Sequence, residues 1–167
     1  MNKLLILILS IALASCSPAY ATETPITGNV QTRCLITTDT NGVFGNPLPS
    51  KLSTLAADGG VVPVVRYDVT LADSYLAKVT TPTSFSSSPS LSDSVAWTGS
   101  TIVTNTTDVG MAGYEAAKIT YGSTTQYDLT VAGSTWFSSE ATASYGGTKS
   151  FPGGSYTAIV LAECIAK

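Results

Sequence analysis

The sequence predicts an all-β sandwich or barrel, and three observations carry this prediction. Short stretches that alternate apolar and polar residues recur along the chain, as expected for strands with one buried face. Clusters rich in glycine, proline, serine and asparagine separate them, as in "NGVFGNPLPS" and "SYGGTKSFPGG". Helix signals are nearly absent, because the best candidate, "GMAGYEAAK", is interrupted by Gly113.

The first element is an export leader. A short positive start, Met1–Lys3, precedes an apolar run, Leu4–Ala14, which is too short to span a membrane. Two processing sites compete. Cleavage after Ala21, in "AYA", would make residues 1–21 a signal peptide, whereas "LASC" resembles a lipobox in which Cys16 would be acylated. We favour cleavage after Ala21, and both sites predict that the protein is exported.

The next element is a strand in "PITGNVQTRCLI", which alternates apolar or small residues with polar ones. The four positions of this face that precede Cys34 are Ile26, Gly28, Val30 and Thr32. After it, "DTNG" favours a tight turn over a calcium loop, because the later acidic ligands of such a loop are missing.

Further strands are predicted in "VVPVVRYDVTL", "YLAKV", "SVAWTG", "AAKITYG" and "YDLTVAG". The third ends at a turn at Gly99 and the last stops at Gly133. "TSFSSSPSLS" is either a disordered linker or, as its strand-like flanks favour, a surface loop. The final predicted strand, Tyr156–Ile165, is apolar on both faces.

The composition argues against several classes of function. The net charge is −3 and no basic patch appears, which argues against a nucleic-acid partner. The chain contains no histidine, which removes Ser-His-Asp and Cys-His nucleophiles and most zinc sites. We therefore expect no enzyme activity, no metal and no cofactor. The tyrosines and two tryptophans fit core packing better than a sugar site.

Two cysteines remain after the leader, Cys34 and Cys164. An even pair in an exported chain predicts a disulfide that ties the first strand to the last, with two free buried thiols as the alternative. The closed loop is on the order of 130 residues, for which the chain-entropy account gives roughly 5 kcal/mol of stabilisation.

Three stretches resemble structural subunits of chaperone–usher fimbriae. "SVAWTGSTIVTNT" (Ser94–Thr106) resembles the mid-domain hairpin of the major subunits of enterobacterial colonisation factors and common pili. "YDLTVAG…FPGGSYTAIVLAECIA" is similar to their last two strands, in which a Pro/Gly turn and a tyrosine precede a long terminal strand. "ITGNVQTRCLI" resembles the N-terminal segment of archaic pilins. The likeness extends over most of the chain after the leader.

The resemblance implies an immunoglobulin-like sandwich that lacks its final strand, so that a hydrophobic groove lies beside the terminal strand. A periplasmic chaperone fills the groove first. At an outer-membrane usher, the N-terminal extension of the next subunit replaces it, and repeated exchange builds an adhesive surface fimbria. The implied partners are identical or related subunits, the chaperone, the usher and a host or surface receptor. Such a strand addition is a head-to-tail contact that propagates into a filament.

On this chain the resemblance places the donor segment in residues 22–33 and the sandwich in residues 34–167. Ile26 and Val30 would fill pockets, and Gly28 between them would allow a close backbone approach or form a simple bend. The donor-strand residues are Ile26, Gly28, Val30 and Thr32. The implied residues of the acceptor-groove edge are Tyr156, Ala158, Val160 and Ala162.

Two questions stay open at this point. A bridge between Cys34 and Cys164 either narrows the groove or braces one end of it. An acylated Cys16 would tether the N-terminal strand to the outer membrane, which favours a second function. In that alternative the protein is an outer-membrane lipoprotein with a self-complete sandwich that acts as a surface binding module. A carbohydrate-active domain is a third class, which the missing histidine and motifs disfavour.

Overall fold

The computed structural model describes residues 27, 33–146 and 149–167. The chain divides into two units, Met1–Val30 and Gln31–Lys167. Of the first unit only Thr27 is described, and it lies outside any helix or strand. All of the described helices and strands belong to the second unit.

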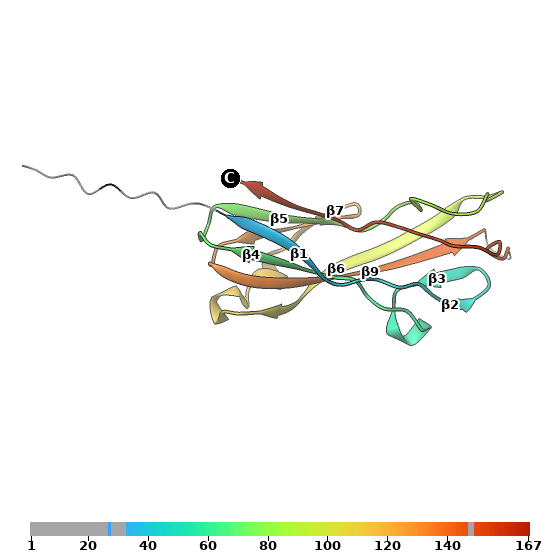
Figure 1. The fold of residues 1–167 in the computed structure, drawn as a ribbon, viewed down its shortest axis with the longest axis horizontal. Coiled ribbons are helices and arrows are strands. Elements are labelled where there is room, and N and C mark those ends of the chain that lie inside the picture. The colour runs from blue at the N-terminus through green and yellow to red at the C-terminus, as the bar shows by residue number, and fades with distance from the viewer. Residues whose placement is uncertain (1–26, 28–32, 147–148) are drawn as a thin grey trace, which may run out of the picture. The chain divides into compact units, whose positions relative to one another are not determined.

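Two antiparallel sheets pack face to face and form the two layers of Figure 1. The first sheet contains β1 (Cys34–Thr40), β2 (Gly45–Leu48), β3 (Lys51–Ser53), β4 (Val64–Val69), β6 (Val95–Thr106) and β9 (Gly133–Tyr145). The second contains β5 (Tyr75–Thr80), β7 (Ile119–Tyr121), β8 (Thr124–Leu129) and β10 (Leu161–Ala166). Short helical turns connect them, η1 (Ala56–Asp58), η2 (Val109–Met111) and α1 (Tyr114–Ala117). The predicted all-β, immunoglobulin-like sandwich is confirmed.

The order of the strands is β1-β4-β9-β3-β2 in the first sheet and β10-β5-β8-β7 in the second. Strand β9 is central, because β4 and β3 pair in turn along one side of it and β6 pairs along the other. Strands β1 and β10 are the edges of their sheets on the same side of the sandwich, where β1 begins and β10 ends close together.

The core lies between the sheets and follows the alternation that the sequence predicts. In β4 the side chains of Val65, Tyr67 and Val69 point inward and are buried. The ring of Tyr67 meets Phe137 edge to face, with 5.2 Å between the centroids. Its hydroxyl donates to the carbonyl oxygens of Lys78 and Glu163 in the other sheet, at 3.2 and 3.1 Å. Burial raises the pKa of Tyr67, which keeps this hydroxyl protonated.

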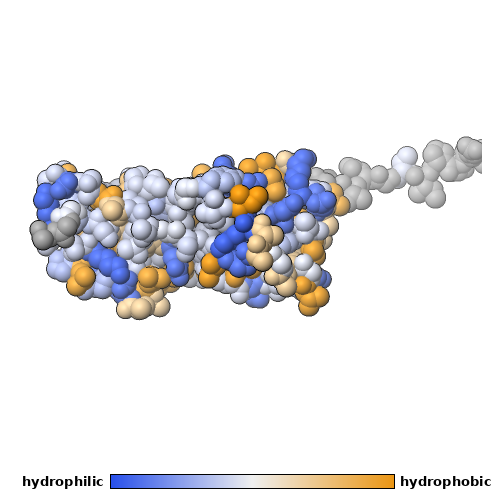
Figure 2. All heavy atoms as spheres, turned by 180° about the vertical axis from the view of Figure 1, so that it is seen from behind, coloured by the Kyte–Doolittle hydropathy of each residue, from blue (hydrophilic) through white to orange (hydrophobic). Residues whose placement is uncertain are grey.

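The surface is uncharged over large areas, as the composition predicts. Figure 2 shows one face of the molecule, most of which is pale because its residues are neither strongly hydrophilic nor strongly hydrophobic. Serine and threonine, which make up 43 of the 146 residues from Thr22 onward, account for this character. In the described part of the chain, no helix is long and apolar enough to cross a membrane.

Two glycines that the sequence analysis took as strand ends lie within or at the start of strands. Gly99 is inside β6, where a Cβ atom would stand 2.7 Å from the carbonyl oxygen of Glu140, so only glycine fits there. The stretch Ser94–Thr106 therefore holds one long strand, Val95–Thr106, and not the hairpin that the resemblance implied. Gly133, with φ of 140°, begins β9, a strand that the sequence analysis did not predict.

The last strand is shorter than predicted. The expected strand Tyr156–Ile165 pairs with β5 only from Leu161 onward. Its partner β5 ends at Thr80, and Pro82, two residues later, has no N–H to continue the ladder. The preceding segment therefore runs extended and, among the described residues, has no sheet partner apart from a single bridge between Thr157 and Ser87.

The stretch "TSFSSSPSLS" is a surface loop, as its flanks favoured, and an aromatic ring anchors it. Phe85 packs edge-on against Trp97 at 4.7 Å and Tyr156 at 5.0 Å between ring centroids. It also contacts Phe44 and Phe151. Most of the aromatic residues thus serve packing, and we call these five rings the aromatic cluster.

Candidate functional site

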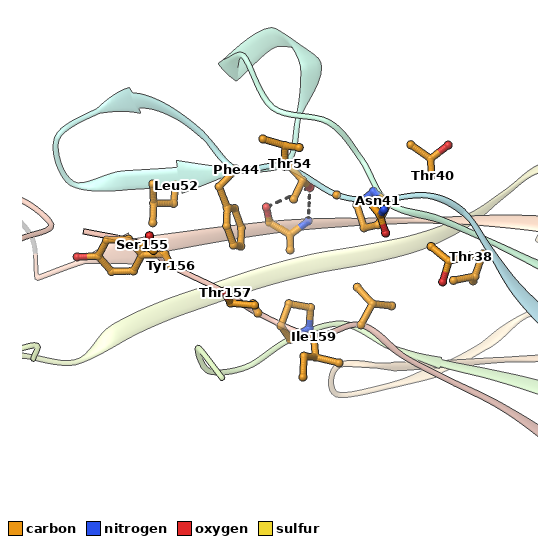
Figure 3. Close-up of a pocket in the computed structure, with 18 of the residues that line it drawn as sticks. Thr38, Thr40, Asn41, Phe44, Leu52, Thr54, Ser155, Tyr156, Thr157 and Ile159 are labelled. Atoms are coloured by element: carbon orange, nitrogen blue, oxygen red, sulfur yellow. Dashed lines mark hydrogen bonds between the residues drawn. The ribbon is translucent and has the colours of Figure 1, made fainter. Parts of the chain in front are cut away.

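A groove with a volume of about 670 Å³ opens between the two sheets beside the C-terminal segment. One rim is formed by residues 41–44, which come directly after β1 in the chain. The other is formed by residues 154–160, which lead into β10. Figure 3 shows Asn41 and Phe44 on the first rim, Ser155 and Ile159 on the second. Between the rims, the floor consists of Leu52, Thr54, Val65, Pro82 and Ala141.

The first rim presents free backbone groups to the groove. Val43 exchanges two hydrogen bonds with Val61, at 2.9 and 2.8 Å, so its N–H and C=O point away from the groove. Because successive residues of an extended chain point their backbone groups to opposite sides, those of Gly42 and Phe44 face the groove. The chain stays extended here, so the tight turn predicted for "DTNG" is wrong. A β-bulge between Thr38 and Thr40 accommodates the extra residue instead.

The second rim repeats this arrangement. Thr157 donates its N–H to Ser87 at 2.8 Å and accepts from Ser86 and Ser87, so its backbone groups are used on the outer side. By the same alternation, the backbone groups of Tyr156 and Ala158 face the groove. Among the residues that the structure describes, no backbone hydrogen bond reaches Gly42, Phe44, Tyr156 or Ala158.

The side chains of the rims alternate as in a strand with one buried face. Tyr156, Ala158 and Val160 are half-buried, whereas Ile159 between them is 62% exposed. On the opposite rim Val43 is 54% exposed, and Phe44 turns into the aromatic cluster. Each rim therefore has the alternation of a strand edge in both its backbone and its side chains.

Hydrogen bonds between β9 and the residue that follows β3 hold the floor of the groove. Thr54 donates its backbone N–H to the carbonyl oxygen of Ala141 at 2.9 Å, and its side-chain oxygen accepts the N–H of Ala141 at 2.9 Å. These bonds continue the pairing of β3 with β9 past the end of β3, and Figure 3 draws those of the Thr54 side chain dashed. They also satisfy polar groups that the groove would otherwise leave buried and unpaired.

The groove carries no charge. Its described lining contains no acidic or basic side chain, and Tyr156 is its single titratable group. The hydroxyl of Tyr156 donates to the carbonyl oxygen of Pro152 at 2.6 Å. Across the described residues, no three His, Cys, Asp or Glu side chains lie close enough together to hold a metal ion. The arrangement offers main-chain hydrogen bonds and apolar contact, which suits an uncharged, extended peptide.

The disulfide lies at one end of the groove. Cys34 in β1 and Cys164 in β10 are bonded, with 6.4 Å between their Cα atoms. The groove begins four residues further along β1, at Thr38, and four residues before Cys164, at Val160. A span of four strand residues is about 13 Å. The bridge therefore lies beyond this end of the groove, and neither of its cysteines belongs to the lining.

The aromatic cluster holds the other end of the groove. Phe44 comes from one rim and Tyr156 from the other, and both pack against Phe85, with centroids 6.2 and 5.0 Å away. The two rims are thus joined by a covalent bond at one end and by packed rings at the other. No sequence pattern could have revealed this cluster, because its members are far apart in the chain.

The predicted site residues divide into three groups. Tyr156, Ala158 and Val160, which were predicted to edge an acceptor groove, are among the residues that line this groove. Ala162 does not, because it lies within β10, where it pairs with Val79 of β5 and packs against the core. The donor-strand residues and the candidate lipidation site lie outside the described residues; they are Ile26, Gly28, Val30, Thr32 and Cys16.

Comparison with known proteins adds no relative. No family model matches the chain, and neither a curated protein nor a solved structure matches it.

Proposed function

We propose that this protein is a structural subunit of a bacterial surface fimbria that polymerises by donor-strand exchange and serves adhesion. The observation that carries the proposal is the groove whose two rims both present unpaired backbone groups. A strand placed between them would bond on both sides, which is stronger than addition to a single sheet edge. A periplasmic chaperone and an outer-membrane usher are the partners that such an assembly requires.

The occupant that we propose is the segment Thr24–Thr32, "TPITGNVQT", of a second copy. It contains no charged residue, like the groove. It is nine residues long, or about 30 Å when extended, whereas the seven residues of the second rim span about 23 Å. Ile26 and Val30 would both point to the apolar floor. Burying each contributes about 1.5–3 kcal/mol before the cost of ordering the segment.

A segment from a second copy fits better than the chain's own segment. Arg33 still follows the course of a strand, because its carbonyl oxygen accepts the N–H of Thr70 at 3.1 Å. A return of the chain therefore has to begin before Arg33. Even with a two-residue turn directly before it, Ile26 would lie opposite Thr37, short of the groove, which begins at Thr38. With cleavage after Ala21, the segment is thus too short to fill its own groove.

The proposal is tested by deleting residues 22–31 from the exported protein, with a synthetic peptide of residues 22–32 as the added donor. We expect the truncated protein to fold, to bind the peptide and to form no polymer, whereas the complete mature protein polymerises. The matched control is the same peptide with Ile26→Asp and Val30→Asp, which should not bind because two charges would enter an apolar floor.

One result would contradict the proposal. If the truncated protein is a stable monomer that the peptide does not affect, the sandwich is self-complete. Acylation of Cys16, measured by mass spectrometry, would then support the surface lipoprotein. Electron microscopy of purified surface material provides an independent check, since the proposal requires filaments.

A further inference from the structure

Strand β6 has a long edge on which none of the described strands lies. It has 12 residues and pairs with β9 alone. Such an edge is a template for pairing with another chain. Other outer strands are poorer templates, because β7 has three residues and β2 has four, including Pro47. Within the described part of the protein, β6 is therefore the longest strand exposed to unwanted pairing.

Two side chains from the neighbouring helical turn occupy the middle of this edge. The carboxylate of Glu115 accepts the backbone N–H of Val103 at 2.9 Å. The ammonium group of Lys118 donates to the backbone oxygen of Thr101 at 3.0 Å and forms an ion pair with Glu115. The hydroxyl of Tyr127 also donates to the oxygen of Thr101, at 2.9 Å.

This pattern is the one that a parallel strand would make. In a parallel pair, one residue of the added strand donates to the carbonyl before a given position and accepts from the N–H after it. Here the position is Ile102, and Lys118 and Glu115 supply the donor and the acceptor. We propose that this ion pair takes the place of a strand on β6 and thereby prevents a second copy of the chain from pairing there.

The geometry of α1 explains why these two residues can act together. They are three positions apart and so share one face of the helical turn. The turn is held by Tyr114, which is buried and whose hydroxyl accepts the N–H of Val131 at 2.9 Å. Both charges are partly exposed, which adds the penalty of displacing hydrated charges to any strand that approaches.

The inference concerns an edge other than the groove and does not rest on the proposed function. The ion pair does not reach the stretch from Val95 to Gly99 on the same edge. A bulge between Val103 and Asn105 breaks the regular course of β6 beyond the ion pair. The capped backbone groups of Thr101 and Val103 therefore lie at the end of the regular part of this edge, just before the bulge.

The test compares the mature wild-type chain with E115A/K118A and with a matched control, K78A/E163A. The control removes an ion pair of similar exposure, at 3.0 Å, that joins side chains of β5 and β10 across the face of the second sheet and does not bind backbone groups of a strand edge. Masses are measured by light scattering, with and without an excess of the peptide of residues 22–32. We expect E115A/K118A alone to shift from monomer to dimer or larger in the presence of peptide. Hydrogen exchange at Val103 should become about tenfold faster in its monomer fraction.

A second variant guards against loss of folding. The swap E115K/K118E keeps an ion pair but places an ammonium group at the N–H and a carboxylate at the carbonyl, so it should also associate. The inference is overturned if both variants melt like the wild type and are monomeric in the presence of the peptide, because any association seen without the peptide would then run through the groove.

Discussion

The groove predicts opposite outcomes for one substitution at two neighbouring positions of β9. Ala141 and Ala143 both point inward and are 2% and 0% exposed. Ala141 lies on the floor of the groove, whereas Ala143 lies beyond it, in the packed part of the sandwich. Leucine at position 141 would extend into empty space, but leucine at position 143 would have to displace packed neighbours.

The expected magnitudes follow from this difference. For Ala143→Leu, overpacking should lower the free energy of unfolding by about 1–3 kcal/mol. In a chain of this size that corresponds to a fall in melting temperature of about 2–12 °C. For Ala141→Leu, the free energy of unfolding should stay within about 0.5 kcal/mol of the wild type or rise, because the groove has room for three more carbon atoms.

The same substitution should impair binding of the donor peptide. Leucine at position 141 would fill the space meant for one apolar donor side chain, whose burial is worth about 1.5–3 kcal/mol. The dissociation constant of the peptide of residues 22–32 should therefore rise about 10- to 150-fold. Calorimetric titration measures this constant, and thermal unfolding measures stability on the same samples.

Two results would refute this reasoning. If Ala141→Leu destabilises the protein as much as Ala143→Leu does, the groove is not free space in solution. If Ala141→Leu leaves the affinity for the peptide unchanged, the floor of the groove does not receive the donor side chains.

Two further predictions concern stability. Replacing Cys34 and Cys164 together with alanine opens a loop with a sequence separation of 130 residues, and urea unfolding should show a loss of about 5 kcal/mol. Without histidine, the free energy of unfolding should be nearly constant between about pH 5 and 8. Hydrogen bonds from Lys51 and Lys149 lower the pKa of Asp58 and Asp93. Their contribution is therefore lost as the pH falls below about 4, and thermal melts across this range check the direction.

The sequence predicted those parts of the fold in which hydrophobic contrast is strong. Strand β4 was found because Val65, Tyr67 and Val69 alternate with polar residues and are all buried. Strand β9 was missed although it is central, because its inward positions include Thr135 and Ser139, which are buried yet polar. Alternation between two kinds of polar or small residue carries little signal.

The candidate site was predicted along one rim only. An apolar terminal segment pointed to Tyr156, Ala158 and Val160, but the length of its pairing depends on Pro82, which is distant in sequence. The opposite rim was taken for a turn, because its extended course is imposed by contacts with Val61 rather than by local preference. Long-range partners decide both features, and no local pattern reports them.

The position of the disulfide has a mechanical consequence for the proposed filament. Tension would enter each subunit at Arg33, where the donor segment begins, and would leave through the strand held in the groove. One rim is joined to this entry point by the backbone of β1. The other is joined to it through the bond between Cys34 and Cys164 and the first residues of β10. Both rims are thus loaded through covalent bonds, so a pulling force can reach the inserted strand without unzipping either sheet.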